Sequence, residues 1–261
     1  MVELTNEERK LDYVKYFNRP LAEVAPEKRA IASGAPLDPS QILPFEDRNK
    51  FLDGTHGLAE SGFGIAANGT GYVANKSFLP GVTSDMMDWW FAWHPIVSDL
   101  RYKLWHHDAH YFARADKVDY ILDPKVPMNQ KTWGVAHSIK EDIGGGAEEF
   151  IIHFMRPADA GLDESIIGTK ECQSLVVGVG EGNPAYMVHK WYEIEGGLML
   201  EDRFWMGYGW MGDGKYGKVL PDGIALPEIA PRGLFNHGCE EFTNLGSLLP
   251  ELYVEYKDKF Q

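Results

Sequence analysis

The sequence predicts an α+β protein in which a curved antiparallel sheet wraps around one long C-terminal helix, behind a helical N-terminal part. Two patterns support this fold class. Six strand-like segments separated by turn signals fill residues 109–208, and a helical pattern then runs from residue 232 to residue 260. A run of strands followed by a helix is typical of architectures in which helices cover one face of an antiparallel sheet.

Short helices are expected in the first eighty residues. Thr5 and Glu8 form a capping box ahead of an apolar-periodic run that ends near residue 17. A second helical stretch ends at Gly34. Residues 52–71 are rich in Gly and Ala with little periodicity, which indicates a loop. We therefore predict a helical N-terminal extension over residues 1–80 and a main domain over residues 81–261.

The main domain is expected to open with a helix that starts at Thr83 or Ser84 and ends before Pro95. Strand-like segments then follow at residues 109–115, 132–142, 147–155, 172–181, 185–196 and 198–208. The last two are predicted to form a hairpin about Gly196 and Gly197. The terminal helix is expected to bend near Pro250. A sheet folded around such a helix leaves a cavity between the two, where a ligand could bind.

Composition and charge narrow the function classes. Of the 261 residues, 44% are hydrophobic and 13% are aromatic, which is enough for a core and an apolar pocket. The formal net charge of −14 argues against nucleic acid and against an anionic membrane surface as partners. No apolar run approaches transmembrane length. These features favour a soluble protein that acts on a neutral or weakly acidic small molecule.

The two cysteines and the N-terminus indicate a cytoplasmic location. Cys172 and Cys239 are too few for a disulfide framework and too isolated for a thiolate zinc motif, so we expect reduced, buried thiols rather than reactive ones. The first ten residues are polar and acidic, without an apolar signal region.

His237 and Glu241 are four residues apart in the terminal helix and therefore lie on one helical face, where they could bind a metal ion together. A zinc site needs four ligands, or three and a water molecule. The stretch HHDAH, with His106, His107 and His110, could supply a third ligand. Each histidine taken alone is more often structural or solvent-exposed than a metal ligand.

Glu141 is a fourth candidate ligand. It follows Val135, His137 and Ile139 on one face of a predicted strand, an apolar row expected to face the cavity. A lone carboxylate there needs a partner. A solvated position at the strand end, beside Asp142, is the alternative. Spacing alone leaves both interpretations open.

The segments MMDWWFAWHPIVSDLRYKLWHHDAHYF, FWMGY and FNHGCEEFTNLGSLLPELY resemble the 2,4-diacetylphloroglucinol hydrolase and phloretin hydrolase family. The resemblance covers residues 80–260 and is weaker in the N-terminal part. It implies a Bet v 1-like, helix-grip catalytic domain and a homodimer. It also implies a zinc-dependent hydrolase that cuts the carbon–carbon bond between a polyhydroxylated aromatic ring and an acyl group. The implied Zn²⁺ ligands are His110, Glu141, His237 and Glu241.

The resemblance also points to residues that contact the substrate, an aromatic ketone. Tyr102 matches a family tyrosine that hydrogen-bonds the substrate, and His189 matches a pocket histidine that could bind a ring hydroxyl or shuttle a proton. The alternatives are a core aromatic and a satisfied core histidine. Tyr208 is a further pocket candidate. Ala113 stands where some relatives carry an amide side chain near the substrate, so the identity of the preferred substrate stays open. His106 and His107 are expected to be exposed rather than hydrogen-bonded to a ligand.

A ring with hydroxyls ortho and para to the acyl group can tautomerise, so that its carbon leaves as an enolate when water attacks the carbonyl. Zinc would polarise an oxygen and lower the pKa of bound water, while Tyr102 and His189 orient phenolic oxygens and transfer protons. A His237→Ala change is then expected to abolish zinc retention and turnover together. Iron, manganese or cobalt would also suit a two-His, two-Glu site. The rival functions are a non-catalytic carrier of aromatic ligands and a zinc hydrolase of esters or β-diketones.

Overall fold

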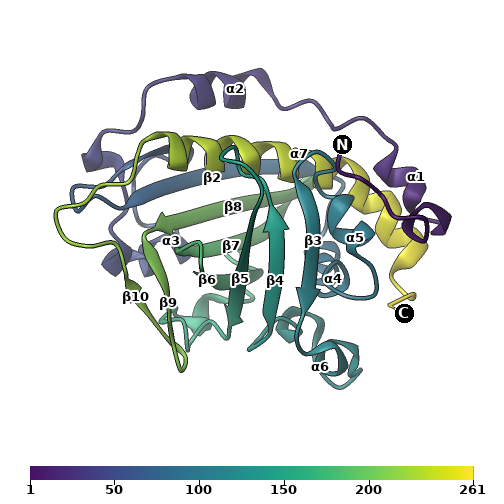
Figure 1. The fold of residues 1–261 in the computed structure, drawn as a ribbon. Helices are drawn as coiled ribbons and strands as arrows, with labels where there is room; N and C mark the ends of the chain where they lie inside the picture. The colour runs from purple at the N-terminus through teal and green to yellow at the C-terminus, as the bar shows by residue number, and fades with distance from the viewer. Residues whose placement is uncertain (261) are drawn as a thin grey trace.

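The computed structural model describes residues 1–260, and an eight-stranded antiparallel sheet dominates it (Figure 1). The strand order is β1-β2-β8-β7-β6-β5-β4-β3. The strands are β1 Gly62–Ile65, β2 Gly71–Pro80, β3 His110–Ala115, β4 Ala136–Glu141, β5 Glu148–Met155, β6 Ser174–Glu181, β7 Ala185–Ile194 and β8 Gly197–Met206. A separate two-stranded ribbon joins β9 (Tyr208–Gly212) to β10 (Lys215–Lys218).

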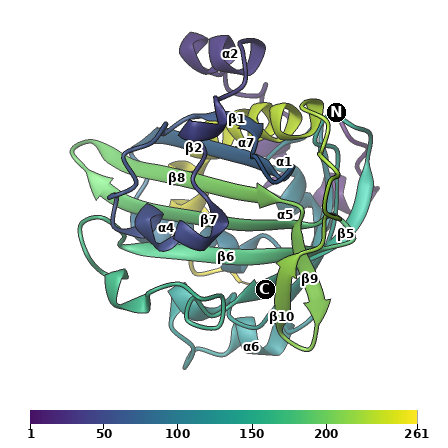
Figure 2. The same cartoon turned by 90° about the vertical axis from the view of Figure 1, so that its left-hand side faces the viewer.

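Helices pack on both faces of the sheet. The longest, α7 (Ile229–Tyr256), is a single helix that continues through Pro250 and packs along β2 and β1 (Figures 1 and 2). The shorter helices are α1 Val14–Phe17, α2 Pro26–Ser33, α3 Asn49–Leu52, α4 Ser84–Trp93, α5 Asp99–Lys103 and α6 Val118–Leu122. Helices α7 and α4 pack on the inner face of the sheet, and α3 packs on the outer face. Helix α2 lies on the side of α7 that faces away from the sheet (Figures 1 and 2). Within the described residues, no helix has both the length and the apolar character that a membrane span requires.

The predicted fold class is confirmed. A large antiparallel sheet curves around one long C-terminal helix, as the alternation of strand and turn signals indicated. All six strand-like segments contain a strand, and β7 and β8 form the hairpin at Gly196. Thr83 caps α4 by accepting a hydrogen bond from the Met86 amide. Thr5 and Glu8 make the two reciprocal bonds of a capping box.

The expectation that residues 1–80 contain only helices and loop is wrong over residues 62–80. β1 and β2 lie there, and β2 pairs with β8 along its whole length. The pattern of β2 is interrupted because Asn75 is polar yet buried on the inner face, where its amide makes hydrogen bonds instead of apolar contacts. Strand propensity depends strongly on such context, so this strand gives a weak sequence signal.

Two apolar layers cover the sheet. On the inner face, side chains of β7 and β8 such as Met187 and Phe204 pack with Phe235 and Phe242 of α7 and with tryptophans of α4. The outer face packs against the chain around Leu43 and Phe51. Cys172 and Cys239 are buried and unpaired, as predicted. The cavity that matters for function lies in the inner layer, between the sheet and α7.

Candidate metal centre and its cavity

Four side chains converge where β3, β4 and α7 meet. His110 begins β3 and Glu141 ends β4, and the two residues are direct partners across the antiparallel pair. His237 and Glu241 lie one turn apart on α7, as the helical spacing predicted. The structure therefore brings all four predicted ligands to one place, with Glu141 facing the cavity and not the solvent.

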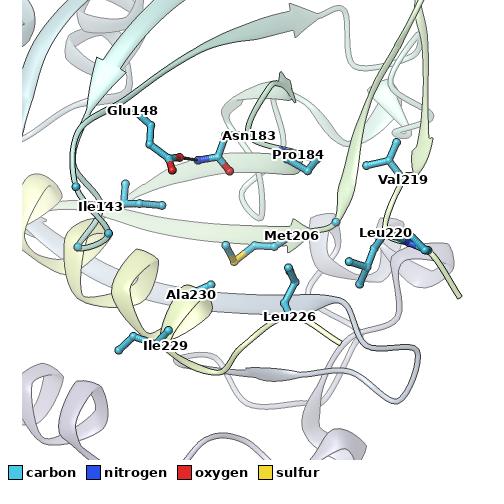
Figure 3. Close-up of a pocket in the computed structure, with 15 residues that line it drawn as sticks. Ile143, Glu148, Asn183, Pro184, Met206, Val219, Leu220, Leu226, Ile229 and Ala230 are labelled. Atoms are coloured by element: carbon cyan, nitrogen blue, oxygen red, sulfur yellow. Dashed lines mark hydrogen bonds between the residues drawn. The ribbon is translucent and has the colours of Figure 1, made fainter. Parts of the chain in front are cut away.

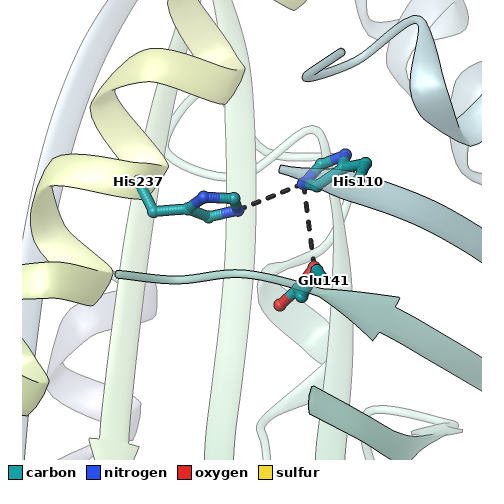
Figure 4. Close-up of side chains that lie close together, drawn as sticks. All are labelled: His110, Glu141 and His237. Carbon is teal, nitrogen blue, oxygen red and sulfur yellow. Dashed lines mark hydrogen bonds and ion pairs between the residues drawn. The ribbon is translucent and has the colours of Figure 1, made fainter. Parts of the chain in front are cut away.

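The ligand atoms of these side chains lie close to one another. His110 Nε2 lies 3.1 Å from His237 Nε2 and 3.7 Å from an oxygen of Glu141 (Figure 4). Glu241 places an oxygen 3.5 Å from His110 Nε2 and 3.7 Å from His237 Nε2. Ligand atoms about 2.0–2.1 Å from a tetrahedral Zn²⁺ are about 3.3 Å apart. The ligand atoms of His110, Glu141 and His237 all lie within 4.8 Å of one another, and Glu241 approaches the two histidine nitrogens. An ion of that size would fit among the four side chains once Glu141 and Glu241 move closer to each other.

The histidines have the protonation state that metal ligation needs. His110 Nδ1 is 3.3 Å from the Tyr102 carbonyl, which can only accept, so Nδ1 carries the hydrogen and Nε2 keeps its lone pair. Burial lowers the pKa of His110 well below its usual value, and burial with the nearby His106 lowers that of His237 to about 3. Both rings are therefore neutral near pH 7.

Among the described residues, neither Glu141 nor Glu241 forms an ion pair with a lysine or an arginine. Burial raises the pKa of Glu141 to about 7, and burial with the neighbouring Glu141 raises the pKa of Glu241 well above its usual range. Placing two such carboxyl groups beside two neutral imidazoles is costly without a cation. The donor set of two nitrogens and two oxygens suits Zn²⁺ and related divalent ions.

Tyr102 lines the cavity beside these ligands. Its ring stacks on His110 with centroids 4.1 Å apart, and its hydroxyl donates a short hydrogen bond to Glu141. Burial and the two glutamates raise the pKa of Tyr102 well above 10, so the hydroxyl stays protonated. Tyr102 thus holds Glu141 in place and offers a hydroxyl at the edge of the metal centre.

His189 forms a second polar group in the same cavity. On the adjacent strand, its cross-strand partner Asp202 accepts a 2.6 Å hydrogen bond from Nδ1–H, which leaves Nε2 free. Asp202 also accepts from Asn75, and Asn75 accepts a 2.6 Å bond from Lys28 of α2. A buried chain of hydrogen bonds therefore orients His189 from behind.

The metal centre lies in a narrow cavity of about 60 Å³. Glu141, His237 and Glu241 line this cavity. The rest of its wall is mostly apolar and aromatic and includes Phe91, His94, Trp105, His137, Ile139, Phe154 and Leu234. Such a mixture of apolar walls and a few convergent polar groups is typical of small-molecule sites.

Three spaces that share wall residues lie in a row from this cavity to the surface, and we call the outer two the apolar passage. Ile152, Met187 and Phe204 line both the metal cavity and an adjoining space of about 50 Å³. That space shares Ile143, Asn183 and Met206 with a surface pocket of about 380 Å³, shown in Figure 3. Glycines 144–146 and the start of α7 form part of the rim of this pocket. A ligand with an elongated apolar end can therefore extend from the metal centre toward the solvent.

Tyr208 does not lie in this cavity. It is buried on the outer face of the sheet, where its ring stacks on Phe45 at 4.1 Å and its hydroxyl accepts from Asn68. Tyr208 therefore packs in the second core. Ala113 is also buried and does not line the metal cavity.

The expectation of exposed His106 and His107 is wrong, because both rings are buried. His106 stacks on His237 with centroids 5.3 Å apart, and its Nε2 donates to Glu240 at 3.2 Å. The Nε2 of His107 donates to the Arg19 carbonyl. His106 thus supports the ring of a candidate ligand by stacking.

Asp202, which lies behind His189, and His94, in the cavity wall, were not identified as site residues from the sequence. Asp202 could have been predicted from the hairpin. Residues at equal distances from the turn at Gly196 pair across the two strands, and this register places Asp202 opposite His189. His137 belongs to the row of β4 residues expected to face the cavity, and it does line the cavity. For His94, at the end of α4, no pattern indicated the cavity.

The fold is a curved antiparallel sheet wrapped around a long helix. The site is a buried group of two histidine and two glutamate side chains between them. The model of the DAPG hydrolase PhiG domain matches residues 42–254, so the chain belongs to the DAPG hydrolase family. It is thus an enzyme of the hydrolase class.

Characterised relatives span nearly the whole chain. Phloretin hydrolase of Eubacterium ramulus is 51% identical over 261 residues, covering 99% of this chain and 95% of that protein. The 2,4-diacetylphloroglucinol hydrolase of Pseudomonas sp is 29% identical, covering 94% and 88% respectively. Among solved structures, that of Ara h 8.0201 covers 70% of this chain and 99% of its own at 10% identity, with a TM-score of 0.40.

Proposed function

We propose that this protein is a zinc-dependent hydrolase of acylphloroglucinols of the phloretin type. It cleaves the bond between the ring and the acyl carbon to give a phloroglucinol and a carboxylic acid. The observation that carries the proposal is the convergence of His110, Glu141, His237 and Glu241 in a cavity with an apolar passage. The 51% identity to a phloretin hydrolase over almost the full chain supports this substrate class.

His110, Glu141, His237 and Glu241 would hold the metal. A bound Zn²⁺ supplies Lewis acidity to a carbonyl oxygen and makes a coordinated water more acidic. The protein fixes the position of these ligands from two sides, since Tyr102 holds Glu141 and the backbone carbonyl of Tyr102 fixes the tautomer of His110.

Proton transfer falls to His189. The reaction must place a proton on the ring carbon that leaves and remove a proton from the attacking water. Asp202 stabilises a protonated His189 ring, and the free Nε2 of that ring lines the cavity. His189 can therefore accept a proton from a ring hydroxyl or from water and return it to the ring carbon. Tyr102, protonated near pH 7, donates a hydrogen bond to an oxygen of the substrate when its contact with Glu141 is exchanged.

The shape of the site suits a flat ring with an acyl tail. The aromatic walls of the metal cavity, including Phe91 and Phe154, match the faces of a ring. The passage lined by Ile152, Met187 and Phe204 would hold a phenylpropanoyl chain. The cavity is narrow, so we expect Met187, the most flexible of these side chains, to move when the ring enters.

Elemental analysis of the purified protein and a phloretin cleavage assay before and after chelation test this function. We expect one zinc per chain and release of phloroglucinol that chelation removes and added zinc restores. If the protein contains zinc and hydrolyses simple esters but does not cleave phloretin, its substrates are esters and not acylphloroglucinols. Binding of phloretin without metal and without turnover would identify a carrier instead.

A further inference from the structure

His137 is a buried histidine in the metal cavity for which the proposed chemistry has no use. It lies on β4, two residues before Ile139, and its side chain is on the same face of the strand as those of Ile139 and Glu141. The side chain is fully buried, and neither ring nitrogen has a hydrogen-bond partner in the structure. Buried polar atoms are nearly always paired, and each one left unpaired is destabilising. Two unpaired nitrogens on one ring therefore require an explanation.

A row of aromatic rings connects His137 to the metal centre. The ring of Tyr102 stacks on His110, His94 stacks on Tyr102 at 5.6 Å, and His137 meets His94 edge-on at 5.8 Å. His94 and His137 line the metal cavity and do not line the adjoining space of the passage. Four residues of β4, about 13 Å along the strand, separate His137 from Glu141, so His137 lies at the end of the cavity away from that candidate ligand and from the passage.

The two histidines offer a defined set of donors and acceptors. His94 Nδ1 donates to the Trp90 carbonyl at 2.8 Å, so its Nε2 is an acceptor. Burial keeps His137 neutral by lowering its pKa well below the usual value, and a neutral imidazole has one N–H donor and one acceptor. A phenolic hydroxyl has the same combination of one donor and one acceptor. The surrounding Phe154, whose ring is 4.5 Å from that of His137, offers only an apolar wall.

We propose that His137 binds the ring hydroxyl that lies farthest from the acyl group, and so makes this enzyme selective for a ring that carries a hydroxyl there. This inference rests on the proposed function. With the carbonyl at the metal and the acyl chain in the passage, the ring extends along Tyr102 and His94, and its distal edge points at His137. His137 is a specificity-determining residue, since it does not touch the bond that is cleaved.

The test compares two ligands that cannot be cleaved. Phloroglucinol has three hydroxyls on its ring and resorcinol has two. Their dissociation constants are measured by calorimetry on zinc-loaded wild-type protein and on His137→Phe. We expect wild-type protein to prefer phloroglucinol at least about 10-fold, because resorcinol leaves one buried partner unpaired. In His137→Phe, only the other two hydroxyl-binding positions remain, and both phloroglucinol and resorcinol can fill them. The preference for phloroglucinol over resorcinol therefore falls to less than about 3-fold.

Controls separate this role from a structural one. His137→Gln retains a donor and an acceptor and is expected to restore part of the preference, and zinc content and melting temperature show whether each variant is folded and loaded. If His137→Phe does not fold, ¹⁵N shifts of the His137 ring in wild-type protein must move with phloroglucinol and less with resorcinol.

Equal affinity for the two ligands in wild-type protein, or an unchanged preference in a folded His137→Phe, overturns the assignment of His137. Phloretin cleavage by the same preparation would still uphold the proposed function. Conversely, a His137-dependent preference without phloretin cleavage would keep the binding site and contradict the proposed reaction.

Discussion

His110 Nε2 and His237 Nε2 lie 3.1 Å apart, although 127 residues separate them in the chain. Since the hydrogen of His110 is on Nδ1, facing the Tyr102 carbonyl, its Nε2 directs a lone pair at the other ring. Two such nitrogens approach this closely only when a proton or a cation lies between them. With the carboxylates of Glu141 and Glu241 beside them, a divalent cation accounts for all four groups.

Glu241 and its neighbour Glu240 provide a matched test of the metal centre. Glu241 faces the cavity, whereas Glu240 pairs with Arg29 at the surface of α7 and with His106. We expect Glu241→Gln to lower zinc affinity by more than the roughly 10–100-fold that loss of an outer-sphere partner causes. Glu240→Gln, which removes the same charge one position away, is expected to retain zinc. Metal content after dialysis against a weak chelator measures both, and equal retention would contradict the ligand assignment.

Asp202 is predicted to act through His189. In Asp202→Asn the amide can no longer stabilise a protonated His189, and its NH₂ group can favour the wrong tautomer of that ring. We expect kcat to fall by about 10²–10⁴-fold with little change in KM or zinc content. A kcat within a few-fold of wild type would show that this pair is structural.

Ala185 is predicted to control which acyl chains are accepted. It lies on β7 and lines the passage but not the metal cavity. Ala185→Phe should therefore narrow the passage and leave the metal centre intact, at a stability cost of about 1–3 kcal/mol for overpacking. We expect kcat/KM for a phenylpropanoyl substrate to fall at least about 10-fold, while an acetyl substrate changes by less than about 3-fold. An equal loss for both substrates would place the acyl chain elsewhere.

Asp88 is predicted to make stability depend on pH. This α4 carboxyl accepts a 2.7 Å hydrogen bond from Ser174, and burial raises its pKa from 3.8 to about 7. Because the folded pKa is the higher one, the contribution of Asp88 to stability is fully present below pH 4 and is lost as the pH rises through 7. Asp88→Asn keeps the acceptor and removes the titration.

Urea unfolding of the metal-free protein measures this effect without a contribution from metal release. Between pH 5 and pH 7, the free energy of unfolding of wild-type protein should fall relative to that of Asp88→Asn as the pH rises. The difference between the two should change by at most about 1.4 kcal/mol per pH unit. Glu195→Gln, which removes a carboxylate at an exposed position outside α4, serves as the control. Parallel curves for wild type and Asp88→Asn would show that Asp88 is ionised in the folded protein throughout.

Local signals predicted much of the fold. The capping residues of α4, the turn at Gly196 and the alternation of the strands from β3 to β8 each depend on neighbours within a few residues. β2 was missed because the polar Asn75 faces a buried network whose other members, Lys28 and Asp202, come from distant parts of the chain. Tyr208 was misplaced for a related reason, since the chain turns at Gly207 and the ring enters the outer core.

The sequence by itself determined the His237 and Glu241 pair, because helical periodicity places residues four apart on one face. It also carried the family resemblance that named His110 and Glu141. Only the tertiary structure decided that Glu141 faces the cavity, that His106 and His107 are buried, and that His137 has no partner. Burial and pairing depend on which segments the closed sheet and α7 bring together. Those contacts join residues more than a hundred positions apart, which no local pattern encodes.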